Sequence, residues 1–430
     1  MHPFEARGPE GAAFRGTPRG ATFHVDRRRP RCRPSPVAVN PFTAVDHSGQ
    51  YDDHRSVCED VKWIVTLAQW PPKANTAVNH PEAHHTMDIL TALNPETPYS
   101  KRRLQLVLGA WVASAAFERK AKVTLDDGHV NEGEYSKQSL YALLYSMYRE
   151  IGTVKTEHGE PYEFTFNTWG YEWPAGWGDA PHGTDPQRFG KNAYRGLFEF
   201  KEVQAYAAAR QGKIHLVEMG CGTGAGAHHI CKTVWPECTY EAFDMQSAGV
   251  QTCNRKFVPE LNGRLVATHG DVTKLEIAAN SADFVVICET HITEMRGEVT
   301  AHDKQFFAKV LNTLKPGGFL VWGNAIPELT WQPCFDHLKS IGMTMVDAHD
   351  VTKEAVVARD LDKARADAYV EQCLDTFHAF KIPVLGKRRA AQARQALLNF
   401  YRNPGTRLYN NMVDGTDTYR VALFQKPMVA

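Results

Sequence analysis

The sequence predicts an α/β protein whose central sheet is mainly parallel. From residue 213 onward, short runs rich in Val, Ile and Phe alternate with segments that have helical spacing of apolar residues. Such alternation produces parallel strands joined by right-handed crossovers. The runs are continuously apolar, as expected for strands that are buried on both faces of a sheet. A glycine-rich turn at residues 220–226 follows the first run.

Seven strands are expected in this sheet. Their ranges are 214–218, 239–243, 265–268, 283–288, 319–322, 343–348 and 418–424. Helices are expected at 227–234 and 306–314, and one long helix at 187–210 precedes the first strand. The long interval between the last two strands carries helical patterns at 353–380 and 387–401. We expect this helical insertion to lie over the ligand-binding end of the sheet and to help enclose a substrate.

The part of the chain before the sheet divides at about residue 45. Residues 1–45 are rich in arginine, proline and glycine, which predicts a disordered leader, with a targeting signal as the alternative. Residues 46–205 are expected to be mainly helical, with helices near 57–68, 104–120 and 135–151. Within them, the aromatic and glycine-rich residues 167–186 form a loop that either packs under a domain or closes over a ligand.

The expected organisation therefore has five parts. They are a disordered leader at 1–45, a helical N-terminal or lid region at 46–205, a cofactor-binding sheet at 206–350, a helical substrate cover at 351–410, and a C-terminal strand at 411–430. A chain of 430 residues has room for about two or three structural units, which fits this division.

Composition excludes some classes of function. The 49 basic and 49 acidic side chains give no net charge, which disfavours a nucleic-acid binder. Nine cysteines without a CxxC pair favour a reduced, cytoplasmic protein over a disulfide scaffold. No apolar run approaches the roughly 18 residues that a membrane span needs. No set of metal ligands stands out, so no metal is expected.

Acidic residues at the expected strand ends indicate a nucleotide-containing cofactor. Asp244 ends the second strand, twenty residues after Gly224, where an acid can bind the two ribose hydroxyls. Asp271 follows the third strand. Ligands of a parallel sheet sit at the carboxyl ends of its strands, and glycines let the backbone approach them closely. The dinucleotide fingerprint GxGxxG fits only with Ala225 in the third glycine position, which the fingerprint also allows.

Several spaced motifs together resemble the class I S-adenosylmethionine-dependent methyltransferases. Val217-Glu-Met-Gly-Cys-Gly-Thr-Gly224 matches the E/DxGxGxG motif of that family, and Lys315-Pro-Gly-Gly318 precedes the fifth strand. The resemblance covers about residues 187–350 and is nearest to the sterol, ubiquinone and natural-product branch. It implies a Rossmann-like sheet of seven strands with the last strand antiparallel, and S-adenosylmethionine as the cofactor.

The resemblance also implies a set of cofactor-binding residues. In the family, the acid after the third strand bonds the adenine amino group, which assigns that role to Asp271. The full expected set is Glu218, Gly220, Cys221, Gly222, Gly224, Asp244, Met245, Asp271, Val272 and Cys288.

Two residues after the fourth strand are candidates for catalysis. Ile287-Cys-Glu-Thr-His-Ile292 resembles an acid-and-histidine element of small-molecule methyltransferases, with a shorter spacing. His291 is the first candidate for a general base, because histidine titrates near neutral pH. Glu289 is the second candidate, or the group that orients His291. The alternative is that Glu289 lines the cofactor pocket and His291 caps the next helix.

Three aromatic residues are candidates for a lid over the substrate. Aromatic faces stabilise cations, so Trp169, Tyr171 and Trp173 are expected to cover the sulfonium or a cationic substrate.

The predicted function is transfer of a methyl group to oxygen, carbon or nitrogen of a small, fairly apolar metabolite. Isoprenoid, polyketide or quinone-like acceptors of secondary metabolism suit the aromatic lid and the helical cover. The partner is then a small molecule, and the protein a monomer or homodimer. The alternatives are an NAD(P)-dependent oxidoreductase on a similar sheet and a catalytically silent S-adenosylmethionine-binding protein.

Overall fold

The computed structural model describes residues 144, 145, 147, 153–155, 161–290, 297–379 and 387–428. The leader predicted at 1–45 and the helices predicted at 57–68 and 104–120 lie outside the described residues. Of the helix predicted at 135–151, Leu144, Tyr145 and Met147 are described, and all three are helical and buried.

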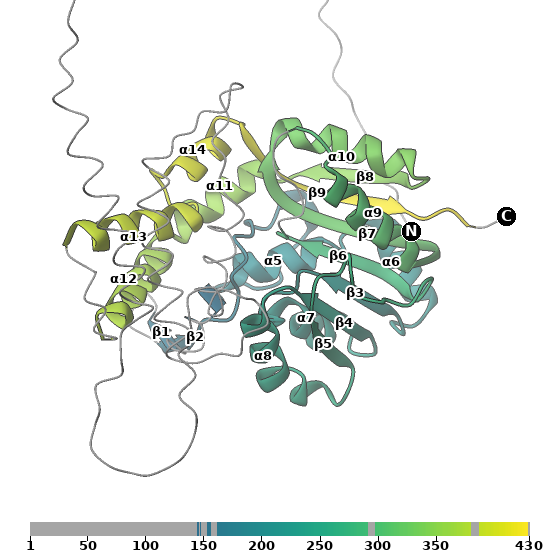
Figure 1. Cartoon of the computed structure of the whole chain (residues 1–430), viewed down its shortest axis with the longest axis horizontal. Helices are drawn as coiled ribbons and strands as arrows, with labels where there is room; N and C mark the ends of the chain where they lie inside the picture. Colours follow the sequence, from purple (N-terminus) through teal and green to yellow (C-terminus); the bar gives the residue numbers. More distant parts are fainter. Residues whose placement is uncertain are drawn as a thin grey trace, which may run out of the picture. The chain divides into compact units, whose positions relative to one another are not determined.

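A seven-stranded sheet contains the strands that the sequence predicts (Figure 1). Its order is β5-β4-β3-β6-β7-β9-β8. The neighbours from β5 to β7 are parallel, and β9 is antiparallel to both β7 and β8. The predicted fold, with its last strand antiparallel, is therefore confirmed. The strands are β3 (His215–Met219), β4 (Thr239–Asp244), β5 (Leu265–His269), β6 (Ala282–Cys288), β7 (Leu314–Pro327), β8 (Thr344–Asp350) and β9 (Asp417–Gln425).

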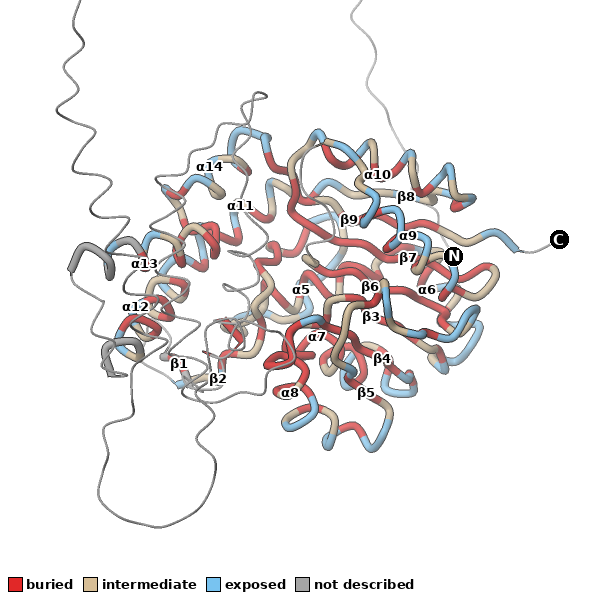
Figure 2. Tube along the Cα trace, viewed as in Figure 1, coloured by how far each residue is buried: buried red, intermediate tan, exposed pale blue. Residues whose placement is uncertain are grey.

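Both faces of the sheet are covered, which explains why its strands are continuously apolar. Successive side chains of a strand point to opposite faces. On β3, Val217 packs in one core cluster and Leu216 in the other. The cluster with Val217 also holds residues of α9 (Ala301–Thr313) and α10 (Glu328–Ser340), including the buried Phe307 and Trp331. Figure 2 shows that the central strands are buried along most of their length.

The cluster with Leu216 belongs to the other face of the sheet. One prediction for the helices on this face was wrong. The single helix predicted at 187–210 is two helices, α5 (Arg188–Gly196) and α6 (Lys201–Ala209). Leu197, Phe198 and Phe200, which lie at the break between the two helices, are all buried. The same face is covered by α7 (Ala225–His229), its π-helical continuation η2 (Ile230–Val234) and α8 (Ser247–Lys256).

The predicted insertion before the last strand is helical. It consists of α11 (Thr352–Leu361), α12 (Lys363–Ala379), α13 (Lys387–Phe400) and α14 (Arg407–Val413). The single helix predicted at 353–380 is wrong, because the chain divides at Asp362. The buried carboxylate of Asp362 pairs with Arg359 at 3.2 Å and with Arg365 at 2.5 Å. These ion pairs join the end of α11 to the start of α12 across the break.

The residues directly before α5 differ from the helical pattern that the sequence predicts for 46–205. Short strands β1 (Thr153–Lys155) and β2 (Pro161–Glu163) form an antiparallel pair. The loop predicted at 167–186 is irregular apart from a one-turn 3-10 helix, η1 (Ala175–Trp177). Elsewhere in the chain, a second 3-10 turn, η3 (Pro259–Leu261), precedes β5.

Three further observations apply to the described part of the chain. None of its helices has the length and hydropathy to cross a bilayer. It contains no cluster of three or more His, Cys, Asp or Glu side chains with metal-binding geometry. Its seven cysteines are free and buried.

Candidate functional site

A cavity opens at the carboxyl ends of β3 and β6. The strand order reverses there, because β3 pairs with β4 on one side and β6 on the other, and such a switch point is where α/β sheets bind ligands. The glycine-rich turn forms one wall. Cys288 and Glu289 at the end of β6, Tyr194 of α5 and Phe400 of α13 line other parts of it. The remaining wall is residues 165–169 with Tyr145. We call residues 165–170 the cover segment.

The glycine-rich turn needs its glycines for conformation and for space. Gly220, Gly222 and Gly224 have φ angles of 98°, 57° and 79°, a region that side-chain-bearing residues rarely adopt. A Cβ on Gly220 would lie 2.3 Å from the Thr290 side chain, and one on Gly224 would lie 2.1 Å from Cys253 Sγ. A side chain at Gly220 or Gly224 would therefore displace Thr290 or Cys253.

Asp244 fixes the glycine-rich turn to the end of β4. Its two carboxylate oxygens accept hydrogen bonds from the backbone N–H of Gly222 and of Gln246, each at 2.7 Å. Burial raises the pKa of Asp244, and these two hydrogen bonds oppose that effect. A carboxylate oxygen has two acceptor positions, so each oxygen retains one for a further donor.

Glu218 lies behind the cavity instead of in its wall. The hydroxyl groups of Tyr194 and Tyr240 donate to its carboxyl oxygens at 2.8 Å and 3.1 Å. Burial raises the pKa of Glu218 to about 8, so the group is largely protonated at neutral pH. Its connection to the cavity runs through Tyr194, which the sequence interpretation missed because nothing in the pattern of α5 distinguishes this tyrosine from a core residue.

Three predicted cofactor residues follow β4 and β5 and do not line the cavity. Met245 is exposed and Val272 is packed in the core cluster of Val217. Asp271 accepts hydrogen bonds from the backbone N–H and hydroxyl of Thr273, at 2.9 Å and 2.7 Å. The predicted set thus divides between the cavity wall, which includes Gly220, Cys221, Gly222 and Cys288, and positions around it.

Glu289 holds the cover segment in place. One oxygen of its carboxylate accepts from the Trp169 N–H at 2.7 Å, and the other accepts from the Gly170 N–H and the Tyr419 hydroxyl, both at 2.8 Å. Burial raises the pKa of Glu289, while these hydrogen bonds oppose the rise. Its φ of 49° is rare for a residue with a side chain, and such outliers gather at functional sites. His291 lies outside the described residues.

Of the three predicted lid residues, only Trp169 lines the cavity. Its indole N–H donates to the Phe400 carbonyl at 2.8 Å, and the Arg402 guanidinium lies 4.5 Å from the centre of a Trp169 ring. Tyr171 and Trp173 are buried outside the cavity wall, where the Tyr171 ring packs edge-on against Tyr419 at 5.2 Å between centroids.

Comparison with known proteins agrees with this geometry. Residues 216–318 match the protein family described as a methyltransferase domain. A phthiotriol/phenolphthiotriol dimycocerosates methyltransferase from Mycobacterium ulcerans is 24% identical over 40% of this chain and 60% of its own length. A fatty-acid O-methyltransferase from Mycolicibacterium smegmatis is 25% identical over 49% of this chain and 68% of its own length. The match therefore spans somewhat less than two thirds of the length of the first relative and slightly more than two thirds of the length of the second.

Among solved structures, the chain is similar to the crystal structure of the [4+2]-cyclase SpnF. It has a TM-score of 0.45 and 15% sequence identity, and the match covers 67% of this chain and 94% of that one.

The strand order, the antiparallel last strand and the glycine-rich turn at the switch point define a Rossmann-like α/β fold. Together with the methyltransferase domain matched at residues 216–318 and the methyltransferase relatives, this fold supports a class I S-adenosylmethionine-dependent methyltransferase.

Proposed function

We propose that this protein binds S-adenosylmethionine and transfers its methyl group to oxygen, carbon or nitrogen of a small, fairly apolar metabolite. The observation that carries the proposal is the cavity at the switch point, where the backbone of the glycine-rich turn faces aromatic side chains of the cover segment. The relative position and approach angle of donor and acceptor supply much of the catalysis in such a transfer, so a cavity wall that fixes both molecules would itself promote the reaction.

The residues present fit the proposed cofactor. Gly220 and Gly222 line the cavity and carry no side chain, which permits close approach of a ligand to the backbone at these two positions. Asp244 retains an acceptor position on each oxygen, as two ribose hydroxyls require. The cofactor supplies an electrophilic methyl group on a sulfonium. The cover segment would exclude water from that group, and the aromatic rings of Phe166 and Trp169 are suited to its positive charge.

The acceptor class is proposed from the lining and from the relatives. The described wall contains the aromatic residues Tyr145, Phe166, Trp169, Tyr194 and Phe400, which favour an apolar molecule. The two relatives above are named for fatty-acid and phthiotriol-lipid methylation, which agrees with an apolar acceptor. We keep isoprenoid, polyketide and quinone-like molecules in the same class. We also propose a cytoplasmic location, because the seven described cysteines form no disulfide with one another.

Binding of the cofactor tests the first half of the proposal. S-adenosylmethionine and S-adenosylhomocysteine should each raise the melting temperature of the protein, because a ligand that binds only the folded state stabilises it. NADH should not. Asp244→Asn should remove the shift, and Asp336→Asn on the exposed side of α10 should retain it. Stabilisation by NADH alone would favour the oxidoreductase alternative.

Turnover tests the second half. A labelled methyl group should appear in at least one member of a panel of fatty acids, isoprenoid alcohols and quinols, with the product identified by mass spectrometry. His291→Ala should abolish the neutral-pH limb of the rate profile if His291 is the base. Full activity of this variant at every pH would remove that assignment, and cofactor binding without any transfer would favour the silent binding protein.

A further inference from the structure

We propose that Gln187, the residue directly before α5, is a positioning residue that sets the width of the cofactor cavity. The inference rests on the proposed function, because the cavity is assigned to the cofactor there. It adds a residue that lies outside the cavity wall and outside every motif of the sequence.

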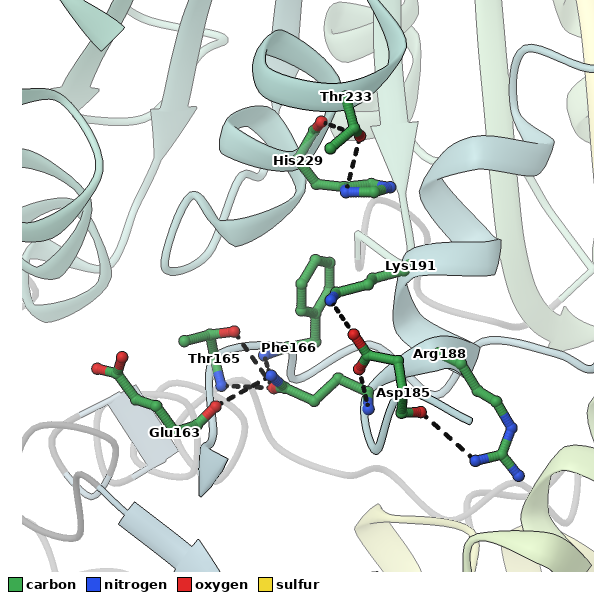
Figure 3. Close-up of polar contacts among 9 residues, drawn as sticks. Glu163, Thr165, Phe166, Asp185, Arg188, Lys191, His229 and Thr233 are labelled. Carbon is green, nitrogen blue, oxygen red and sulfur yellow. Dashed lines mark hydrogen bonds and ion pairs between the residues drawn. The ribbon is translucent and has the colours of Figure 1, made fainter. Parts of the chain in front are cut away.

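The carboxamide of Gln187 holds one end of the cover segment. Its oxygen accepts from the Thr165 N–H at 2.7 Å, the Thr165 hydroxyl at 3.2 Å and the Phe166 N–H at 3.0 Å. Its amide nitrogen donates to the Glu163 carbonyl at 3.0 Å. Thr165 and Phe166 belong to no strand or helix, so this one side chain provides the partners that a sheet neighbour would otherwise supply. Figure 3 shows the backbone of Thr165 and Phe166 within this group of contacts.

Gln187 is itself fixed by its neighbours. Its backbone N–H donates to an oxygen of Asp185 at 2.7 Å, and the other oxygen of Asp185 forms an ion pair with Lys191 on the first turn of α5 (Figure 3). The Arg188 N–H also donates to the Asp185 carbonyl at 3.0 Å. The carboxamide therefore projects from a rigid helix start, which gives it a defined position relative to the sheet.

The residues that Gln187 holds belong to the cavity wall. The Thr165 carbonyl accepts from the hydroxyl of Thr223 in the glycine-rich turn at 2.9 Å, which joins the cover segment to the turn directly. The Phe166 ring lines the cavity, with its centroid 6.1 Å from that of Tyr194. A Cβ on Gly190 would lie 2.9 Å from the Phe166 Cβ, so α5 also limits how far this ring can retreat.

The two ends of the cover segment have separate anchors. Glu289 holds Trp169 and Gly170 from the end of β6, whereas Gln187 holds Thr165 and Phe166 from the start of α5. Loss of the Gln187 carboxamide should therefore release one end only. Thr165 and Phe166 would then move away from the cavity and widen it, while Trp169, Gly170 and the sheet keep their contacts.

The test compares three variants by calorimetric binding of S-adenosylhomocysteine, melting temperature and steady-state kinetics. Gln187→Ala should weaken binding about tenfold and raise the KM for S-adenosylmethionine by a similar factor, with kcat nearly unchanged. Gln187→Glu keeps the acceptor oxygen for Thr165 and Phe166 but loses the donor to the Glu163 carbonyl, so its affinity should lie between those of Gln187→Ala and the native protein. The control is Gln332→Ala on the exposed side of α10, where the amide donates a hydrogen bond to Asp336.

Each outcome decides something. Binding by Gln187→Ala within about twofold of the native protein overturns the inference and leaves the proposed function intact. Equal loss in Gln187→Ala and Gln187→Glu also overturns it, since the acceptor oxygen would then not matter. A native protein that binds neither S-adenosylmethionine nor S-adenosylhomocysteine overturns the proposed function, and with it this role. Faster amide exchange at Thr165 and Phe166 in Gln187→Ala, with unchanged exchange at Trp169, supports the one-ended release.

Discussion

The carboxylate of Glu289 and the backbone N–H of Trp169 are joined by a 2.7 Å hydrogen bond across 120 residues of sequence. The bond ties the end of β6 to the cover segment, so a strand of the sheet determines where a wall of the cavity lies. It also gives Glu289 a structural task that a general base does not need. The two roles differ in what they predict for cofactor binding and for the chemical step.

We expect Glu289→Gln to impair cofactor binding. An amide presents one acceptor oxygen, so one of the N–H groups of Trp169 and Gly170 would face an NH₂ group and lose its partner. Because hydrogen bonds to charged groups contribute about 1.5–3 kcal/mol, the affinity for S-adenosylhomocysteine should fall at least about tenfold. Calorimetry measures this directly.

Tyr419→Phe is the matched control for Glu289. It removes one of the three donors to the same carboxylate and leaves both backbone contacts in place. A small loss of affinity is expected, below about threefold. If Glu289→Gln instead binds S-adenosylhomocysteine normally and loses only kcat, Glu289 acts in the chemical step and the anchoring account fails.

Glu218 should make the protein less stable as the pH rises. Its pKa is about 8 in the folded state because of burial and lies near 4.5 when exposed, so the folded state binds more protons between these values. The contribution is fully present below about pH 4.5 and is lost as the pH rises through about 8. Glu218→Gln should remove about 2–3 kcal/mol of this dependence between about pH 6 and pH 9 in urea unfolding. Glu237→Gln on the exposed surface should leave the dependence unchanged.

His229 should make the protein less stable in acid. Burial, with the nearby His182, lowers the pKa of His229 from 6.5 to about 3, so the unfolded state binds more protons below about pH 6.5. Stability is present above that pH and is lost as the pH falls toward about 3. The Nδ1 atom of His229 lies 3.1 Å from the Thr233 hydroxyl (Figure 3), which orients the neutral ring. In an NMR titration, the His229 ring signals should remain those of the neutral form at about pH 4.5. A midpoint near 6.5 would contradict this.

Arg402 should contribute strongly to stability. Its guanidinium pairs with Asp417 at 2.9 Å and donates to the Ala325 carbonyl at 3.0 Å, and both charged residues are buried. Arg402→Met leaves an unpaired buried carboxylate, which costs about 3–5 kcal/mol. The double variant Arg402→Met/Asp417→Leu should recover part of this loss in urea unfolding. A single-variant cost below about 1 kcal/mol would show that water reaches the pair.

The sheet and the glycine-rich turn were predictable because local rules determine them. Strands such as β6 are continuous Val and Ile runs, and Gly220 and Gly222 take backbone conformations that favour glycine. The antiparallel last strand was implied by the resemblance to the class I methyltransferases that these motifs carry. The helical insertion followed from its spacing of apolar residues.

The closure of the site was not predictable in the same way. Gln187 holds Phe166 and Arg359 donates to the Trp169 carbonyl, while Tyr194 lines the cavity and also contacts Glu218. No local pattern marks such residues. The break after α5 falls at Leu197 and Phe198, whose burial is a property of the packed fold. For the same reason, Trp169, Tyr171 and Trp173 were all predicted to be lid residues, although of the three only Trp169 lines the cavity.

The contacts of Trp169 also determine when the site can exist during synthesis. Its indole N–H donates a hydrogen bond to the Phe400 carbonyl, and the Glu289 carboxylate that holds its backbone accepts one from the Tyr419 hydroxyl. A ribosome makes the sheet strands β3 to β7 well before either residue, and domains fold as their residues emerge. The nascent protein can therefore form the glycine-rich turn long before it can close the cavity. The site is complete only after Tyr419 has been made.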